Sequence, residues 1–320
     1  MSVLVKNPGL LTTVQDVGRY GFSHLGISSC GAADATAFRI ANLLLGNEEN
    51  AAALEMTLLG ATLEFEEAAV IAVTGANCDC RLNNETAPLW EPIKVAAGGA
   101  LTCAGMKTGA RAYLAVQGGF DIPRVMGSAS TDLAAGFGGH SGRKLLRGDM
   151  LRVRKKHPSP GRKSARKPPR KASRFSAAAL ESLYPSGPIR VTKGAQHEWF
   201  GAEAFEKLFS SAYAVSDDSD RSGLRLKGEA IRPSNTKQLL TDGIPLGAIQ
   251  VPQNGQPIIL FVDQRTTGGY PKIANVIAAD MHRVGQLRPR DPVRFAEVTI
   301  AEAIELVRKQ EKWLKRILDS

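Results

Sequence analysis

Residues 110–119, ARAYLAVQGG, cluster apolar side chains over a short run that ends in paired glycines. Short apolar runs broken by Gly, Pro, Asn or Asp indicate β-strands. The same pattern recurs through both halves of the chain. Such runs occupy residues 3–7, 61–65, 69–75, 92–103 and 148–154, and later residues 189–194, 211–216, 223–228, 247–252, 257–262 and 291–298.

Helical signals are fewer. Residues 34–45 carry Phe38, Ala41 and Leu45 on one face, and Gly46 is a suitable stop. Further helices are predicted at 176–183, 197–209 and 299–316, the last opening with the capping-box pair Thr299 and Glu302. Many short strands with few helices favour closed or sandwiched β structure over a parallel sheet. We therefore predict two β-rich domains, each closed into a barrel.

A basic segment divides the chain. The net charge is +10, with 41 Lys and Arg against 31 Asp and Glu. Residues 154–174 hold ten Lys or Arg side chains, four prolines and no acidic residue. The rest of the chain therefore contains 31 Lys and Arg and 31 Asp and Glu. Such a segment is expected to be a disordered linker without specific nucleic-acid recognition. The predicted domains are 1–153 and 175–320.

Composition and sequence motifs argue against a membrane protein, a secreted protein and a zinc protein. Hydrophobic content of 43% and charged content of 22% are typical of a soluble globular protein. No apolar run is long enough to cross a membrane, and the first residues do not form a signal peptide, so a cytoplasmic location is expected. Cys78 and Cys80 are too closely spaced for a usual zinc pair, and no metal is expected.

The richest polar stretch is 262–272, VDQRTTGGYPK, which follows the apolar run 257–261, PIILF. A plain turn needs only a few special residues. This segment supplies carboxylate, amide, hydroxyl and ammonium groups, and Gln250 lies one strand upstream. Such a set suits a small polar ligand bearing a carbonyl or carboxylate. The candidates in this stretch are Asp263, Gln264, Thr267, Gly268, Gly269, Tyr270 and Lys272.

Other polar clusters lie beside strands: residues 12–19 with Asp16, residues 127–131, and residues 219–221 with Arg221. The glycine run 136–142 contains His140 and either presents backbone N–H groups to an anion or forms a bend at a barrel corner. No phosphate-binding loop, nucleophile elbow or zinc-protease motif is present. Met106-Lys107 matches only part of a biotinylation motif, so no covalently attached biotin is expected.

Nine blocks, in order, resemble the family of 5-oxoprolinase C subunits, also called the allophanate hydrolase subunit 2 or KipI-antagonist family and labelled a biotin-dependent carboxyltransferase family. The resemblance covers nearly all of 1–153 and 186–298. The blocks are LLTTVQDVGRYGF, GAADATAFRIANLLLGN, ALEMTLLGATLEF, AVTGA, GGFDIPRVMGS, GGHSGRKLLRGD, SDRSGLRL, GAIQVPQNGQPIILFVDQRTTGGYPKIA and QLRPRDPVRF.

The resemblance implies a mainly β fold of two cyclophilin-like β-barrel domains with a few flanking helices. It also implies one component of a bacterial ATP-dependent multisubunit hydrolase, active as a complex with the A and B subunits, which opens 5-oxoproline to glutamate. The ATP site would lie on, or be shared with, a partner. Two alternatives stay open: a carboxyltransferase acting on urea or a similar amide with biotin supplied in trans, and a regulatory partner of a cyclophilin-like inhibitor.

On this resemblance Asp263 is expected to be a base or an N–H acceptor, and Tyr270 and Lys272 to steady developing negative charge. Gln250 would anchor the amide, and the glycines would let the backbone approach the ligand. Gln264, Thr267, Arg221, Asp16 and His140 complete the expected substrate-binding set. The chain departs from the family pattern at Ala129, where Arg is usual, and at Arg290, where a turn glycine is usual.

Overall fold

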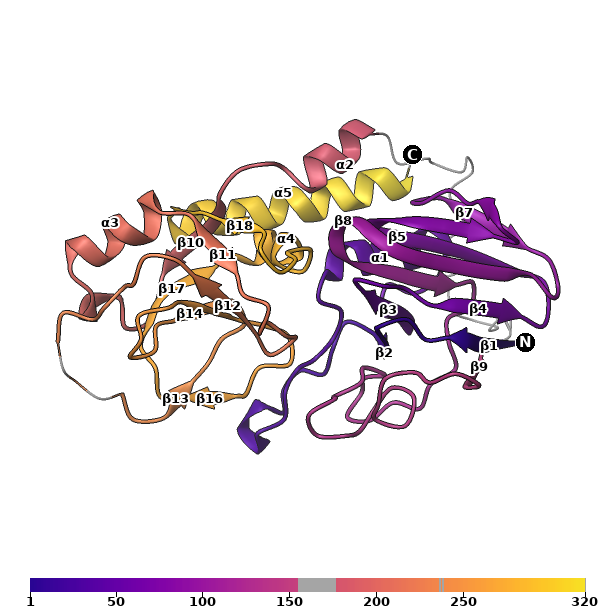
Figure 1. The fold of residues 1–320 in the computed structure, drawn as a ribbon, viewed down its shortest axis with the longest axis horizontal. Helices are drawn as coiled ribbons and strands as arrows, with labels where there is room; N and C mark the ends of the chain where they lie inside the picture. Colours follow the sequence, from indigo (N-terminus) through magenta and orange to yellow (C-terminus); the bar gives the residue numbers. More distant parts are fainter. Residues whose placement is uncertain (155–176, 236, 238, 320) are drawn as a thin grey trace. The chain divides into compact units, whose positions relative to one another are not determined.

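The computed structural model describes residues 1–154, 177–235, 237 and 239–319, and their architecture is mainly β (Figure 1). The mainly β fold class with few helices is therefore confirmed. Apart from Arg154, the basic segment 154–174 lies outside the described residues. Among the helices that the structure does describe, none is both long and apolar enough to cross a membrane.

The chain forms two compact units. The first comprises Met1–Arg19, Cys30–Leu180 and Trp313–Ser320, and the second comprises Tyr20–Ser29 and Glu181–Lys312. Each unit therefore contains a segment that is remote in sequence from the rest of it. The sequence-based domain bounds 1–153 and 175–320 stay a prediction.

A nine-stranded antiparallel sheet builds the first unit, with the order β2-β3-β8-β4-β1-β9 and with β5 joining β8 to β6 and β7. The long strand β8 (Ala100–Val116) pairs with β3, β4 and β5, so it connects all parts of the sheet. The other strands are β1 (Ser2–Asn7), β2 (Leu11–Gln15), β3 (Ala53–Thr57), β4 (Thr62–Phe65), β5 (Ala69–Leu82), β6 (Glu85–Thr86), β7 (Pro92–Val95) and β9 (Met150–Arg152).

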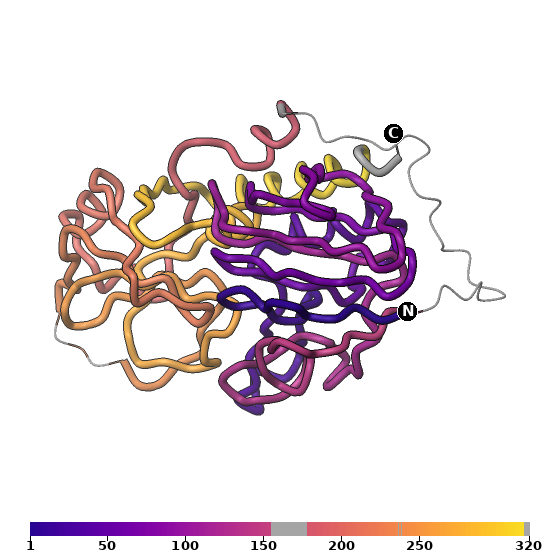
Figure 2. Tube along the Cα trace, turned by 45° about the vertical axis from the view of Figure 1, so that its right-hand side comes forward, coloured from indigo at the N-terminus to yellow at the C-terminus, as the bar shows by residue number. Residues whose placement is uncertain are grey.

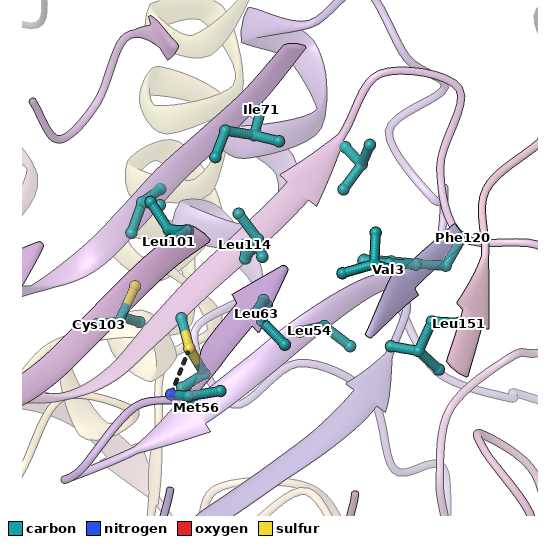
Figure 3. Close-up of a cluster of buried hydrophobic side chains, with 14 of the residues drawn as sticks. Val3, Leu54, Met56, Leu63, Ile71, Leu101, Cys103, Leu114, Phe120 and Leu151 are labelled. Atoms are coloured by element: carbon teal, nitrogen blue, oxygen red, sulfur yellow. Dashed lines mark hydrogen bonds between the residues drawn. The ribbon is translucent and has the colours of Figure 1, made fainter. Parts of the chain in front are cut away.

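The register between β5 and β8 shifts next to Gly75. Gly75 has a φ of +88°, and a Cβ there would lie 2.4 Å from the Arg111 carbonyl oxygen. Only glycine fits such a close approach in this backbone conformation. Inward-facing side chains from the strands then pack into one core (Figure 3), which includes Val3, Leu54, Leu63, Leu114 and Phe120.

The helix α1 (Ala35–Leu44) begins where the sequence predicts. The Asp34 carboxylate accepts a hydrogen bond from the Ala37 N–H at 2.8 Å and caps the first turn. The Thr74 hydroxyl of β5 donates to the Ala37 carbonyl oxygen at 2.8 Å, and the Phe38 ring packs edge-on against Tyr113 of β8. The helix therefore packs on strands β5 and β8 through its apolar face.

The second unit contains an eight-stranded sheet that curves into a nearly closed barrel (Figure 2), with the order β18-β11-β12-β15-β14-β17-β10-β19. A separate pair, β13 (Asp242–Gly243) and β16 (Thr267–Gly268), lies outside this sheet. The eight strands are β10 (Ile189–Lys193), β11 (Tyr213–Val215), β12 (Gly223–Lys227), β14 (Ala248–Gln250), β15 (Ile258–Leu260), β17 (Lys272–Val276), β18 (Pro292–Val293) and β19 (Phe295–Glu297).

The later predicted helices form, but one of them is interrupted, and a short helix over residues 281–284 is not predicted. The predicted helix 197–209 is interrupted, because Phe200 and Gly201 are extended between a 3₁₀ turn and α3. The capping box of α5 is confirmed, with the Thr299 N–H and hydroxyl donating to Glu302 at 2.7 and 2.8 Å. The elements are α2 (Ala177–Leu183), α3 (Ala202–Ser210), α4 (Met281–Val284), α5 (Ile300–Asp319), η1 (Ser23–Leu25), η2 (His197–Trp199) and η3 (Ala278–Asp280).

Candidate functional site

The polar segment 262–272 joins β15 to β17 in the second unit. Its middle forms β16, which pairs antiparallel with β13, so that Gly268 faces Asp242 and Thr267 faces Gly243. The segment is thus held at both ends by strands of the barrel sheet and in the middle by the short antiparallel pairing of β16 with β13. This framework brings side chains from distant parts of the sequence beside the segment.

The Asp263 carboxylate forms a two-pronged ion pair with Arg221. The Arg221 Nε donates to Oδ2 at 2.8 Å and Nη2 donates to Oδ1 at 3.0 Å. Both side chains are buried, and the Asp263 N–H also donates to the Arg221 carbonyl oxygen at 2.9 Å. A bidentate guanidinium favours the ionised carboxylate and fixes its orientation. The Asp263 carboxylate is therefore held in one orientation.

Lys272 is almost fully buried, with 2% of its side chain exposed, and its Nζ lies 2.9 Å from Asp242 Oδ2. The hydrogen bond from Lys272 lowers the pKa of the Asp242 carboxyl below its usual value. Gln196 connects the two, because its Oε1 accepts from the Lys272 N–H at 3.2 Å and its Nε2 donates to Asp242 Oδ2 at 3.4 Å. The ammonium group is thereby fixed in place beside β16.

Two buried glutamines flank this pair. Gln250 Nε2 donates to the Tyr270 carbonyl oxygen at 3.3 Å, and Gln264 Nε2 donates to the Ile244 carbonyl oxygen at 3.0 Å. The Gln264 Oε1 is buried and has no hydrogen-bond partner among the described residues. A buried amide oxygen without a donor is costly, so this atom is suited to receive an N–H from a ligand.

The remaining candidates of this segment differ in exposure. Tyr270 is 46% exposed, Thr267 and Gly269 are exposed, and Gly268 is partly buried. A Cβ on Gly268 would lie 2.7 Å from Ile244 Cδ1 and 3.0 Å from Gln250 Nε2. Glycine at this position therefore allows the backbone of β16 to approach Gln250.

Asp16 and His140 belong to the first unit, whereas the other candidates belong to the second. The Asp16 carboxylate accepts hydrogen bonds from the hydroxyls of Ser128 and Ser130 at 2.5 and 2.6 Å. It also accepts from the N–H groups of Ala129 at 2.7 Å and Gly18 at 2.8 Å. The polar clusters 12–19 and 127–131 are thus brought together, and Asp16 organises their backbone.

His140 lines a cavity of about 580 Å³ in the first unit, together with other residues of the glycine run. Its Nε2 lies 3.5 Å from Asp149 Oδ1. Asp149 also receives two hydrogen bonds from Arg143, which lower the pKa of its carboxyl to about 2. His140 therefore faces a carboxylate that is already paired.

Sequence reasoning missed Asp242 and Gln196, the partners of Lys272. Asp242 precedes Gly243, and an Asp-Gly pair signals a turn, but nothing local to it indicates a contact with Lys272. Gln196 carries no motif at all. Both contacts depend on strand pairing in the folded barrel.

Taken together, the second-unit residues present a fixed ammonium, an ionised carboxylate, amide groups and an unpaired amide oxygen. These groups can bind a carbonyl oxygen, an amide N–H and developing negative charge. Within the part of the chain that the structure describes, no group of three or more His, Cys, Asp or Glu is arranged to hold a metal ion.

The family model "Carboxyltransferase domain, subdomain A and B" matches residues 25–297. The chain is also 40% identical over 309 residues to the C subunit of 5-oxoprolinase from Escherichia coli K12, a match that spans 97% of this chain and 95% of that protein. The chain belongs to the family of 5-oxoprolinase C subunits. The corresponding protein of Haemophilus influenzae is 38% identical over 95% of this chain and 94% of its own length.

Members of this carboxyltransferase-domain family also occur inside larger proteins. The crystal structure of the K. lactis urea amidolyase matches 99% of this chain with a TM-score of 0.90 and 32% identity. This chain corresponds to 20% of that protein. The family membership inferred from the nine sequence blocks is therefore confirmed, and the shared fold extends over nearly the whole chain.

Proposed function

We propose that this chain is the C component of an ATP-dependent 5-oxoprolinase, a cytoplasmic enzyme complex that opens the lactam of 5-oxoproline to glutamate. In this reaction a water oxygen becomes bonded to the lactam carbonyl carbon, the C–N bond breaks, and the nitrogen gains a proton. A second water is consumed as ATP becomes ADP and phosphate. The single observation that supports this function most strongly is the 40% identity to a 5-oxoprolinase C subunit over 95% of that protein's length.

The second-unit site supplies groups that this chemistry needs. The Lys272 ammonium, held by Asp242, would stabilise the oxyanion that develops as the lactam carbonyl is attacked. The exposed Tyr270 hydroxyl would assist it from the mouth of the site. Because both are donors, they favour the charged transition state over the neutral substrate.

The lactam N–H needs an acceptor. The buried Gln264 Oε1 and the Asp263 carboxylate are suitable acceptors, and Gln250 would orient the amide plane. The two hydrogen bonds from Arg221 orient the Asp263 carboxylate, and we assign to Asp263 the role of N–H acceptor or base. Thr267, Gly268 and Gly269 would form the adjacent backbone wall.

We further propose that the complex contains A and B subunits and that ATP binds on, or is shared with, one of these partners. The sequence contains no phosphate-binding loop of the usual spacing. The ATP-dependent step would then occur on that partner or where it meets this chain. Asp16 and His140 would act in the first unit as substrate-binding residues.

The test is reconstitution from purified A and B subunits and this chain with 5-oxoproline and MgATP, with glutamate measured as product. We expect glutamate formation only with all three proteins and ATP, and loss of activity when this chain is omitted. Addition of the missing chain should restore the rate. Full activity of A and B without this chain would contradict the proposal.

One structural observation favours a second candidate function. The fold matches a urea amidolyase structure with a TM-score of 0.90, and the family model carries the carboxyltransferase name. The same donors and acceptors would hold urea while a carboxyl group moves to its nitrogen from carboxybiotin supplied in trans. Transfer of the labelled carboxyl group from free carboxybiotin to urea by this chain, measured as labelled carboxyurea, would support this candidate over the first.

A further inference from the structure

Arg19 stands out in the first unit because its positive charge is buried without an acidic partner. Its side chain is among the largest fully buried ones, with 2% exposed. It follows β2 and the segment that carries Asp16. Among the ion pairs of the described residues, none includes Arg19. Burial of an unpaired cation is expensive in free energy.

The contacts that Arg19 does make leave much of its guanidinium unsatisfied. Its Nη2 donates to the Ser130 carbonyl oxygen, and its Cζ lies 4.7 Å from the centre of the Phe137 ring. Its Nε and Nη1 are buried and have no hydrogen-bond partner within residues 1–154, 177–235, 237 and 239–319. These two nitrogens carry three of the five N–H donors of a guanidinium.

The neighbouring carboxylate does not compensate this charge. Asp16 is three residues away in sequence, but its oxygens accept bonds from Ser128, Ser130, Ala129 and Gly18. Among the described residues, Asp16 therefore makes no ion pair with Arg19. The N–H groups on Nε and Nη1 of Arg19 are therefore available to bind an oxygen atom of a ligand.

The guanidinium also adjoins the wall of the 580 Å³ cavity. Phe137 and Gly138 line that cavity, and both contact Arg19. Gly138 has a φ of +70°, and a Cβ there would lie 2.8 Å from Arg19 Nη2 and 2.2 Å from the Ser130 carbonyl oxygen. The absence of a side chain at 138 thus lets the glycine run 136–142 lie directly against Arg19.

We propose that Arg19 anchors an oxyanion site beneath the glycine run 136–142, and that this site takes a carboxylate or phosphate group. Guanidinium donors match the oxygens of both groups, and backbone N–H groups in a glycine-rich loop favour the same ligands. Entry of the anion requires the Phe137–Gly138 backbone to shift. The carboxylate source, 5-oxoproline, rests on the proposed function, whereas the phosphate source does not.

The experiment uses the full chain and two probes, sodium phosphate and sodium 5-oxoprolinate, titrated by calorimetry against a sodium chloride background of equal ionic strength. We expect saturable binding of one anion per chain for at least one probe. Arg19→Gln should weaken that binding at least 10-fold. Arg19→Lys keeps the charge but not the planar fork, so it should weaken binding less. Arg81→Gln, an exposed arginine of the same unit, should bind as the unaltered chain does.

A second readout does not depend on any variant folding. Hydrogen exchange of the unaltered chain should slow in residues 136–142 when the bound probe is present. The proposal is overturned if neither probe binds saturably, if Arg19→Gln binds within two-fold of the unaltered chain, or if binding leaves exchange in 136–142 unchanged.

The two probes also separate this proposal from the proposed function. If phosphate binding depends on Arg19 but the reconstituted complex is inactive, the anion site is supported and the 5-oxoprolinase proposal is contradicted. Arg19-dependent binding of 5-oxoprolinate but not phosphate would identify a carboxylate as the occupant, and would place 5-oxoproline in the first unit instead of at Lys272.

Discussion

Two buried charged residues of the proposed site each form an ion pair, but their partners differ in exposure. Lys272 and Asp263 are both buried, yet Lys272 pairs with the half-exposed Asp242 and Asp263 pairs with the buried Arg221. Removal of Lys272 leaves a carboxylate that water can solvate, whereas removal of Asp263 takes the bidentate carboxylate away from the buried Arg221. Lys272 is therefore the residue whose function can be tested with less damage to the fold.

The sequence predicts Asp263 and Lys272 as site residues, but it does not predict their ion-pair partners. The sequence identifies Asp263 and Lys272 because they lie in one conspicuous polar stretch. Their partners Arg221 and Asp242 lie 42 and 30 residues away. Such contacts depend on how distant segments meet in the fold, and the residues around Asp263 and Lys272 do not indicate which distant segment that is.

Arg290 gives a prediction about backbone strain. It occupies the left-handed region with a φ of +73°, which favours glycine, and its contact with Asp217 is a surface ion pair at 3.5 Å. We expect Arg290→Gly to raise the free energy of unfolding by about 0.5–1 kcal/mol relative to Arg290→Ala. Both variants lose the ion pair, so their difference in urea unfolding isolates the backbone term. Equal stability of the two would contradict this interpretation.

Among the elements, strands β10 and β17 position the site most directly. The Lys272 end of β17 is held against the residues after β10, where the Gly194 N–H donates to the Ile273 carbonyl oxygen at 2.9 Å. A Cβ on Gly194 would lie 2.3 Å from the Lys272 carbonyl oxygen and 2.7 Å from the Ala274 nitrogen. The two strands can approach this closely only because residue 194 has no side chain.

Gly194→Ala should therefore push β17 away from this contact. We expect a loss of about 1–3 kcal/mol in the free energy of unfolding, because backbone atoms must move to remove the overlap. Gly243→Ala is the matched control, since a Cβ at 243 meets nothing within 4 Å. Urea unfolding monitored by circular dichroism measures the stability of both variants. Equal stability of Gly194→Ala and Gly243→Ala would contradict the predicted overlap.

The sequence predicts elements better than it predicts their ends or their pairing. The capping signals of α1 and α5 are local, and the structure confirms both helices. The predicted helix 197–209 is broken at Phe200 and Gly201, since apolar periodicity alone does not distinguish a 3₁₀ turn followed by a helix from one continuous helix. The β13–β16 pair was not predicted, because each strand has only two residues.

For the whole molecule, two β units from one chain carry different sets of polar groups. The second holds the ammonium, carboxylate and amide groups of the proposed lactam site, and the first holds Asp16 and Arg19 with its unsatisfied donors. The mainly β class and the family could be predicted from strand spacing and ordered blocks. The assignment of Asp16 and His140 to a different unit could not, since membership of a unit depends on the folded contacts.

The most direct test of the proposed site is the kcat of Lys272→Met in the reconstituted complex with MgATP and 5-oxoproline. Methionine keeps most of the side-chain volume but removes the charge, and Asp242 is exposed enough to be solvated. We predict a fall of about 10²–10³-fold in kcat with the complex still assembled, as for loss of one oxyanion donor. Arg265→Gln, an exposed change in the same loop, should keep the rate within two-fold. A Lys272→Met complex as active as that control would contradict the account.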